Sequence, residues 1–225
     1  MLFRSRSGLF LSSLDAVNGW FKYHGLFSRF LADSLQRSAP SAVVEVHGIA
    51  ARWHLAQGSH EEAVFHAVQA QDHPLATDAL SLWSSRLVAR AELVTVERWY
   101  DALPFEDVSS RVDLSIKVAW ALIFMRRRAK VRPLIEQLAR RKGQGQISHT
   151  TDPDVVLAMA ALFEDDLRGA ARIADKPEVH SSVEEGFPAF ELNAAANLLA
   201  FARISASDFE SARKLIALEI GRAHV

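Results

Sequence analysis

Apolar residues recur every three or four positions through most of the chain, which is the spacing of one face of an α-helix. The pattern predicts helices over about 26–37, 41–57, 60–71, 75–90, 94–102, 111–127, 131–141, 153–163, 165–174, 188–204 and 208–218. Most connections between them are short, so neighbouring helices are expected to run antiparallel. Two connections, 142–151 and 175–187, are longer and polar. The predicted fold class is therefore all-α.

The first 24 residues follow a different pattern. Leu9–Leu14 is short, apolar and suited to a β-strand, and Asn18-Gly19 supplies the positive backbone angles of a tight hairpin turn. The stretch from Leu9 to His24 therefore predicts strand, turn, strand. From Leu26 onward the spacing becomes helical. A hairpin that feeds directly into a helix so close to residue 1 is expected to be the end of a domain whose front is missing.

The same segment carries a motif, L-F-L-x-x-L-D followed by W-F-x-Y-H-x-L-F-x-x-F-L. Its residues here are Leu9, Phe10, Leu11, Leu14, Asp15, Trp20, Phe21, Tyr23, His24, Leu26, Phe27, Phe30 and Leu31. The motif resembles the junction between winged helix and helical superhelix in MalT-like transcriptional regulators, the LuxR-type, ATP-dependent activators of the STAND class. Gly25 departs from the family, which often carries a second His or a Pro there. The resemblance continues more loosely to Leu103-Pro104 and fades after about residue 140.

This resemblance implies a domain order of NTPase, winged helix, a superhelix of tetratricopeptide-like helix pairs, and a LuxR helix-turn-helix. Residues 1–24 are then the remnant of the winged helix, and 25–218 the sensor superhelix. Such a sensor binds an inducer or a regulatory protein and controls ATP-dependent oligomerisation on DNA. ATP belongs to the missing NTPase domain, so no cofactor and no direct DNA contact are expected in this segment. A free-standing repeat scaffold that docks peptides stays an alternative.

An internal repeat supports the stacked-pair architecture. Gly58-x4-Ala63-x6-Ala70 has the small-residue spacing of a tetratricopeptide-like helix, and weaker echoes begin at Arg126, Asp165 and Ser207. The intervals are uneven, whereas a strict repeat would keep a period near 34 residues. Degenerate helical pairs in a short solenoid are predicted, and an irregular helical bundle stays open.

Composition limits the classes of partner and the cellular compartments that are expected for the chain. The formal net charge is −1, so no global field attracts nucleic acid or an anionic membrane surface. Cysteine is absent, which removes disulfides and thiolate metal sites and is compatible with a reducing cytoplasm. No stretch approaches the roughly 20 apolar residues that span a bilayer, and the start lacks the pattern of a signal peptide. A cytoplasmic protein is expected.

The sequence carries no catalytic signature. It contains no phosphate loop of the G-x4-G-K-[ST] type, no G-x-S-x-G and no H-E-x-x-H. A non-enzyme is therefore expected, and a helical enzyme with an unrecognised site stays open. Histidines recur at six- or seven-residue spacing at His47, His54, His60, His66 and His73, but a zinc pair on a helix normally sits at i, i+4. No metal site is predicted.

Two other groups of residues are candidates for binding. Asn193 and Asn197 lie one turn apart on an alanine-rich helix, where Asn is a poor helix former. They predict a ligand- or peptide-binding site in a concave groove, or hydrogen bonds to a neighbouring helix or loop. The basic run Arg126–Arg128, with Lys130 and Arg132, could bind phosphate, or could simply place cations at the negative end of a helix.

The last residues, 219–225, resemble the in-frame translation of a widely used sequencing adapter. They are expected to be a non-native tail, and the chain is expected to be truncated at both ends. A natural short tail is the alternative.

Overall fold

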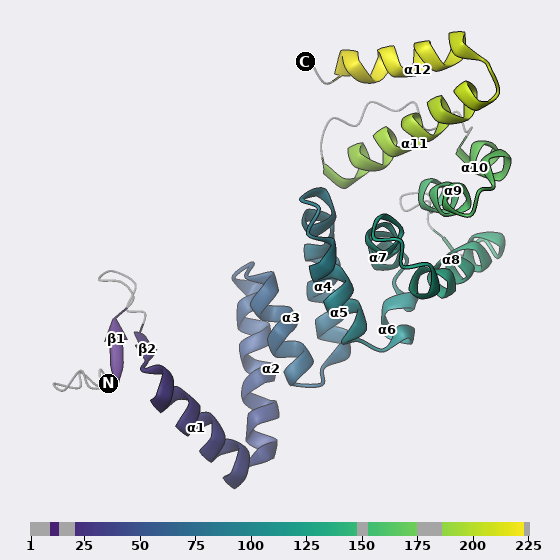
Figure 1. The fold of residues 1–225 in the computed structure, drawn as a ribbon. Helices are drawn as coiled ribbons and strands as arrows, with labels where there is room; N and C mark the ends of the chain where they lie inside the picture. The colour runs from purple at the N-terminus through teal and green to yellow at the C-terminus, as the bar shows by residue number, and fades with distance from the viewer. Residues whose placement is uncertain (1–9, 14–20, 148–152, 175–185, 223–225) are drawn as a thin grey trace.

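The computed structural model describes residues 10–13, 21–147, 153–174 and 186–222. A two-stranded hairpin precedes a curved stack of helices that runs from α1 at one end to α12 at the other (Figure 1). The elements are β1 (Leu11–Ser13), β2 (Phe21–Tyr23), α1 (Gly25–Ser38), α2 (Pro40–Ala56), α3 (His60–Gln69), α4 (His73–Ala89), α5 (Leu93–Asp101), α6 (Phe105–Ser110), α7 (Val112–Phe124), α8 (Arg128–Gly143), α9 (Asp154–Phe163), α10 (Leu167–Ala174), α11 (Gly186–Ser205) and α12 (Phe209–Arg222). The predicted all-α class with a short N-terminal hairpin is confirmed. None of the described helices is long and apolar enough to cross a lipid bilayer.

The hairpin has the predicted strands. β1 and β2 pair antiparallel, with Leu11 opposite Tyr23. The predicted turn at Asn18-Gly19 and the ring of Trp20 lie outside the described residues. Phe27 of α1 joins the strands to the helix, because its ring centroid lies 4.6 Å from that of Phe10 and 5.6 Å from that of Tyr23. Much of this aromatic cluster faces solvent.

The core is centred on α7. Every residue from Leu114 to Ile123 is buried, and α4, α5, α6, α8 and α9 pack around this helix. Trp120 is fully buried, and its Nε1 donates a hydrogen bond to Oε1 of Glu191 on α11 at 2.9 Å. This bond joins helices 71 positions apart in the sequence. It therefore ties the later helices to the middle of the stack.

Several predicted helix boundaries are wrong. The short helix α6 was not predicted, because six residues directly after Pro104 show too little periodicity to be distinguished from a loop. The predicted helix 111–127 ends at Phe124, so Arg126 and Arg127 lie in a turn. The next helix begins at Arg128 rather than 131 and holds Pro133 inside it. The last helix continues to Arg222, beyond the predicted end at 218.

The last helix also buries less of its apolar stripe than the sequence suggests. Ala212 is buried and Leu215 half-buried, but Phe209 is 66% exposed and Ile216 39% exposed. Among the described elements, α12 packs on α11. Contact with that single helix covers only one side of the stripe.

Six of the turns between consecutive helices share one geometry. A residue in the left-handed region, with φ between 56° and 72°, follows α2, α3, α4, α7, α9 and α11; these residues are Gly58, Gln71, Ala91, Arg126, Asp165 and Ser207. At the α7–α8 turn, the N–H of Arg126 donates to the carbonyl of Ile123 and that of Arg127 to the carbonyl of Leu122. These two bonds define the Schellman motif, which satisfies the last carbonyls of a helix.

The repeated turn explains the internal repeat seen in the sequence. Gly58 and its echoes at Arg126, Asp165 and Ser207 are all left-handed turn residues. The fifth residue after each is buried against a neighbouring helix; these are Ala63, Val131, Ala170 and Ala212. The repeat therefore records one helix–turn–helix geometry used several times, which supports stacked pairs over an irregular bundle.

A histidine cluster joins α2 to α3. Nδ1 of His47 lies 2.8 Å from Nδ1 of His66, and the ring of His54 stacks on that of His66 with centroids 5.4 Å apart. Among the residues that the structure describes, no three or more His, Asp or Glu side chains are arranged to hold a metal ion. Burial lowers the pKa of His66, and the neighbouring His47 and His54 lower it further. The fold therefore favours the neutral form of His66.

Replacing a left-handed alanine by glycine should stabilise the fold. Ala91 has φ of 57°, where an L-residue is strained and glycine is not. We expect Ala91→Gly to raise the free energy of unfolding by about 0.5–1 kcal/mol in urea titrations, since relief of strain exceeds the added chain entropy. Ala89→Gly, two residues earlier at the end of α4, is the matched control and should lower it by about 0.5 kcal/mol. Destabilisation by Ala91→Gly would contradict the strained turn.

The histidine cluster should make stability depend on pH. Because the pKa of His66 is lowered in the folded state, the unfolded chain binds more protons as the pH falls through about 6.5, and stability decreases. We expect the melting temperature to fall between pH 7.5 and 5.5, and to fall less in His66→Gln. His24→Gln, in the exposed segment before α1, controls for the loss of one histidine. An equal fall in melting temperature in His66→Gln and in the unaltered chain would show that protonation of His66 does not cause the pH dependence.

Candidate functional site: an apolar pocket with an arginine rim

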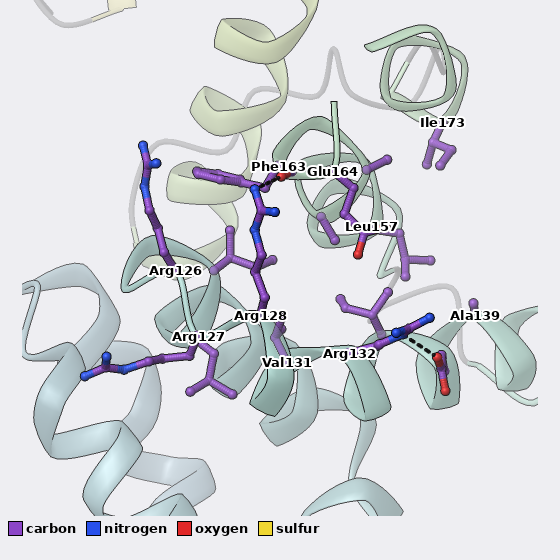
Figure 2. A pocket seen from close by; sticks show the side chains of 16 residues that line it. Arg126, Arg127, Arg128, Val131, Arg132, Ala139, Leu157, Phe163, Glu164 and Ile173 are labelled. Carbon is purple, nitrogen blue, oxygen red and sulfur yellow. Dashed lines mark hydrogen bonds and ion pairs between the residues drawn. The ribbon is translucent and has the colours of Figure 1, made fainter. Parts of the chain in front are cut away.

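A cavity of about 370 Å³ lies between α7, α8, α9 and α10. Ligand pockets in proteins commonly span about 300–1,000 Å³, so this one has the size of a small-molecule site. Its lining residues are Leu122, Ile123, Arg126, Arg127, Arg128, Val131, Arg132, Ile135, Glu136, Ala139, Leu157, Ala160, Ala161, Phe163, Glu164 and Ile173. They come from two successive helix pairs, α7–α8 and α9–α10 (Figure 2).

The interior of the pocket is apolar because it continues the core. Leu122 and Ile123 belong to the buried run of α7, and Val131 on α8 is also buried. On the opposite wall, Ala160 and Ala161 of α9 have short side chains, and this leaves space between α8 and α9. The pocket therefore results from small residues at a place where larger ones would have closed the helix contact.

The rim is basic. Arg128 and Arg132 lie one turn apart on α8, and Arg128 extends from α8 toward the end of α9 (Figure 2). An Nη2 group of Arg128 donates to the carbonyl oxygen of Phe163 at 3.0 Å. The guanidinium carbon of Arg126 lies 5.9 Å from the centre of the Phe163 ring. Two guanidinium groups therefore meet at the C-terminal end of α9.

The basic residues between Arg126 and Arg132 have two structural roles: some pair with carboxylates of α5, and the others lie at the pocket. Arg127 points away from the pocket and pairs with Glu97 of α5 at 3.0 Å, and Lys130 pairs with the same carboxylate at 2.7 Å. Lys130 also bonds Asp101 at 2.7 Å. The hydrogen bond from Lys130 lowers the pKa of Glu97, and that from Arg127 adds to the effect. These two cations hold α8 to α5, while Arg126, Arg128 and Arg132 remain at the pocket.

The remaining charges at the pocket are unbalanced. Arg132 pairs with Glu136 at 3.2 Å, but both side chains are more than half exposed, and such pairs contribute little. None of the ion pairs among the described residues includes Arg126 or Arg128. Setting Arg127 aside, the rim carries three guanidinium groups against the carboxylates of Glu136 and Glu164. The pocket can therefore accept an anionic group.

The asparagines singled out in the sequence do not line this pocket. Asn193 and Asn197 are both exposed on α11 and share one face of that helix, as their spacing predicts. They also lie outside a second cavity, of about 340 Å³, between α10 and α11. A role in binding stays a prediction for both.

The sequence indicated the arginines at the rim of the pocket but not the apolar residues that line its interior. The basic run was recognised from its charge alone, and nothing in the local spacing distinguishes Ala160 and Ala161 from ordinary contact alanines. The signal that could have found the pocket is long-range, because α8 must be placed against α9 before the gap between them is visible. A single sequence does not supply that placement.

Comparison with known proteins identifies the N-terminal segment. Residues 4–43 match the MalT winged helix domain, and this match includes β1, β2, α1 and the start of α2. It extends past residue 24, where the sequence predicted the winged helix to end. That boundary stays a prediction. No solved structure matches the chain.

Two kinds of curated relative are similar to the chain. One is the serine/threonine-protein kinase PknK, from Mycobacterium tuberculosis and from Mycobacterium bovis. Each of these kinases is 28% identical to this chain over 215 residues, which cover 93% of this chain and 19% of the kinase. The HTH-type transcriptional regulator MalT of Cronobacter sakazakii is 30% identical over 171 residues, which cover 75% of this chain and 19% of the regulator. The chain thus spans about a fifth of the length of these relatives. The resemblance found in the sequence is confirmed: the chain is similar to MalT-like regulators, because residues 4–43 match the MalT winged helix domain and three quarters of the chain is similar to a MalT regulator.

Proposed function

We propose that the chain is the sensory and regulatory segment of a MalT-like transcriptional activator. In this proposal the helical stack receives a signal, as an inducer or a regulatory protein, and the signal controls NTPase-driven oligomerisation and DNA binding by domains outside the chain. The supporting observation is the pocket between α7 and α10, set in a helical region that follows a match to the MalT winged helix domain. The similarity to a transcriptional regulator, over three quarters of this chain, supports the same proposal.

The position of the pocket suits a switch. A ligand shifts an equilibrium only as far as its affinity differs between two states. Because the pocket is shared by the α7–α8 and α9–α10 pairs, its shape changes whenever one pair moves relative to the other. A ligand bound there would favour the arrangement that closes around it. Movement between helix pairs would then be passed along the stack, toward the hairpin.

We assign to this chain the recognition of an inducer or a regulatory protein, and no catalytic step. ATP is expected at an NTPase domain, and DNA at a LuxR-type helix-turn-helix, both outside this segment. The helical pairs are proposed to be tetratricopeptide-like, and self-association is assigned to the full-length protein. Since transcription takes place in the bacterial cytoplasm, the protein is placed there.

A second candidate function comes from the similarity to PknK, which covers 93% of this chain. The same segment could regulate a protein kinase instead of a transcriptional activator. In that case the sensor role is unchanged and the output is phosphorylation. A free-standing scaffold is a third candidate. The gene sequence on either side separates them: an NTPase and a LuxR motif indicate the activator, a kinase domain indicates the second candidate, and neither indicates the scaffold.

The regulator proposal can be tested in the full-length protein. We expect chromatin immunoprecipitation to find it at discrete promoters, and transcripts from those promoters to change across a panel of growth conditions. Ala139→Trp places a large ring at an exposed position of the pocket lining and should abolish that response. Ala56→Trp, at the exposed end of α2, is the matched control and should leave it intact.

Each result has a separate meaning. Absence of promoter occupancy would exclude a transcriptional activator. Occupancy with an undiminished response in Ala139→Trp would exclude the pocket as the site where the signal enters.

A further inference from the structure

We infer that the pocket binds a small amphipathic anion, with an apolar body between α8 and α9 and a single carboxylate or phosphate group at the arginine rim. The inference rests on the proposed function in one respect, since it takes the pocket as the place where the signal is received. The chemical class of the ligand is argued from the pocket lining alone.

The walls favour an apolar body. The lining contains Leu, Ile, Val, Ala and Phe side chains together with Arg and Glu, and it has no hydroxyl or amide side chain. A sugar or another neutral polyol would bury hydroxyl groups without enough partners, and each unpaired polar group is costly. An alkyl chain or a small ring system buries no polar group on entering and gains free energy from leaving water. The interior therefore selects against neutral polar ligands.

The rim favours one anionic group. Arg128 uses an Nη2 group on the carbonyl of Phe163, a neutral partner that leaves its charge uncompensated. The guanidinium fork matches the two oxygens of a carboxylate or phosphate, and such charge-assisted bonds are among the stronger ones in proteins. Arg132 can join it at little cost, because its pair with Glu136 is exposed to solvent. Arg126 adds a third positive group at the same end of α9.

Helix ends do not supply or cancel this charge by themselves. The run follows the C-terminus of α7, whose carbonyls are negative, and begins α8, whose N-terminal amides are positive. These two contributions oppose each other, and the C-terminus of α9, where Arg126 and Arg128 meet, adds negative partial charge. The positive field at the rim therefore comes from the formal charges of the arginines. Since the whole chain has a net charge of −1, the rim is a local concentration of positive charge on a nearly neutral protein.

The carboxylates at the rim limit the charge of the ligand. Glu136 on α8 and Glu164 after α9 both line the pocket. They would repel a polyphosphate or a nucleic acid backbone, which carries several adjacent negative charges. A ligand with one anionic head can contact Arg128 while keeping its distance from both.

Isothermal titration calorimetry of the 225-residue chain tests the inference with three probes that share an eight-carbon skeleton, the anions kept below their micelle concentrations and the alcohol below its solubility limit. They are octanoate, octyl phosphate and neutral 1-octanol. We expect octanoate or octyl phosphate to bind saturably at one site, and 1-octanol to bind at least about tenfold more weakly, since it lacks the charge-assisted bonds. Whichever anion binds more tightly identifies the head group as carboxylate or phosphate, and both outcomes support the inference.

Variants locate the binding. Arg128→Gln should weaken binding of the preferred anion about tenfold or more, while Arg98→Gln, an exposed arginine on α5, should leave it unchanged. Ala139→Trp, at an exposed lining position where folding tolerates a large ring, should abolish it. Circular dichroism confirms that each variant is folded.

Five results would overturn the inference: no binding of either anion, binding of 1-octanol as tight as that of the anions, uptake of the anions without saturation, unchanged binding in Arg128→Gln, or binding retained in Ala139→Trp. These failures are distinct from failure of the proposed function, which is decided by promoter occupancy. A chain that binds no anion but whose full-length form still responds at promoters would keep the sensor role and lose only this ligand class.

Discussion

The burial of α7 is the constraint on which the rest of the structure depends. This helix is buried on all its faces from Leu114 to Ile123, and most of these residues are apolar, so it is stable only when other helices surround it. α4, α5 and α6 cover one part of it, and α8 and α9 another. Even Lys117 is drawn into this region, where its Nζ is neutralised by Asp113 at 2.7 Å. The pocket lies beside the C-terminal end of α7, where Leu122 and Ile123 form part of its lining.

The hydrophobic period was enough to predict most helices and the class of the fold. It failed where a different physical effect decides the boundary. Arg126 was assigned to the end of the predicted helix 111–127, where cations meet the negative helix terminus, yet it adopts the left-handed region and closes the turn. Glycine or asparagine would have marked such turns, but only Gly58 among these turn residues is of that kind. The geometry of each turn is imposed by packing of the two helices it joins.

The candidate site could be predicted only in part, for a related reason. Charge is a local property, so the run from Arg126 to Arg132 was visible in the sequence. The assignment of each cation was not, because Arg127 finds Glu97 at a distance of 30 positions along the chain. The asparagines on α11 illustrate the reverse case, since their shared face was predicted correctly while the pocket lies elsewhere.

Similarity to both a kinase and a transcriptional regulator is compatible with the proposed sensor role, because one signal-binding segment can be joined to different output domains. The pocket adds a consequence for how such a segment can diversify. All of its lining comes from one uninterrupted stretch between Leu122 and Ile173. The bond between Trp120 and Glu191, which ties the later helices to α7, uses residues outside that stretch. Exchange of residues 122–173 between homologous proteins would therefore transfer the whole pocket lining and keep the Trp120–Glu191 bond, and the recipient's architecture would also require the pairing of Arg127 and Lys130 with α5 to be kept.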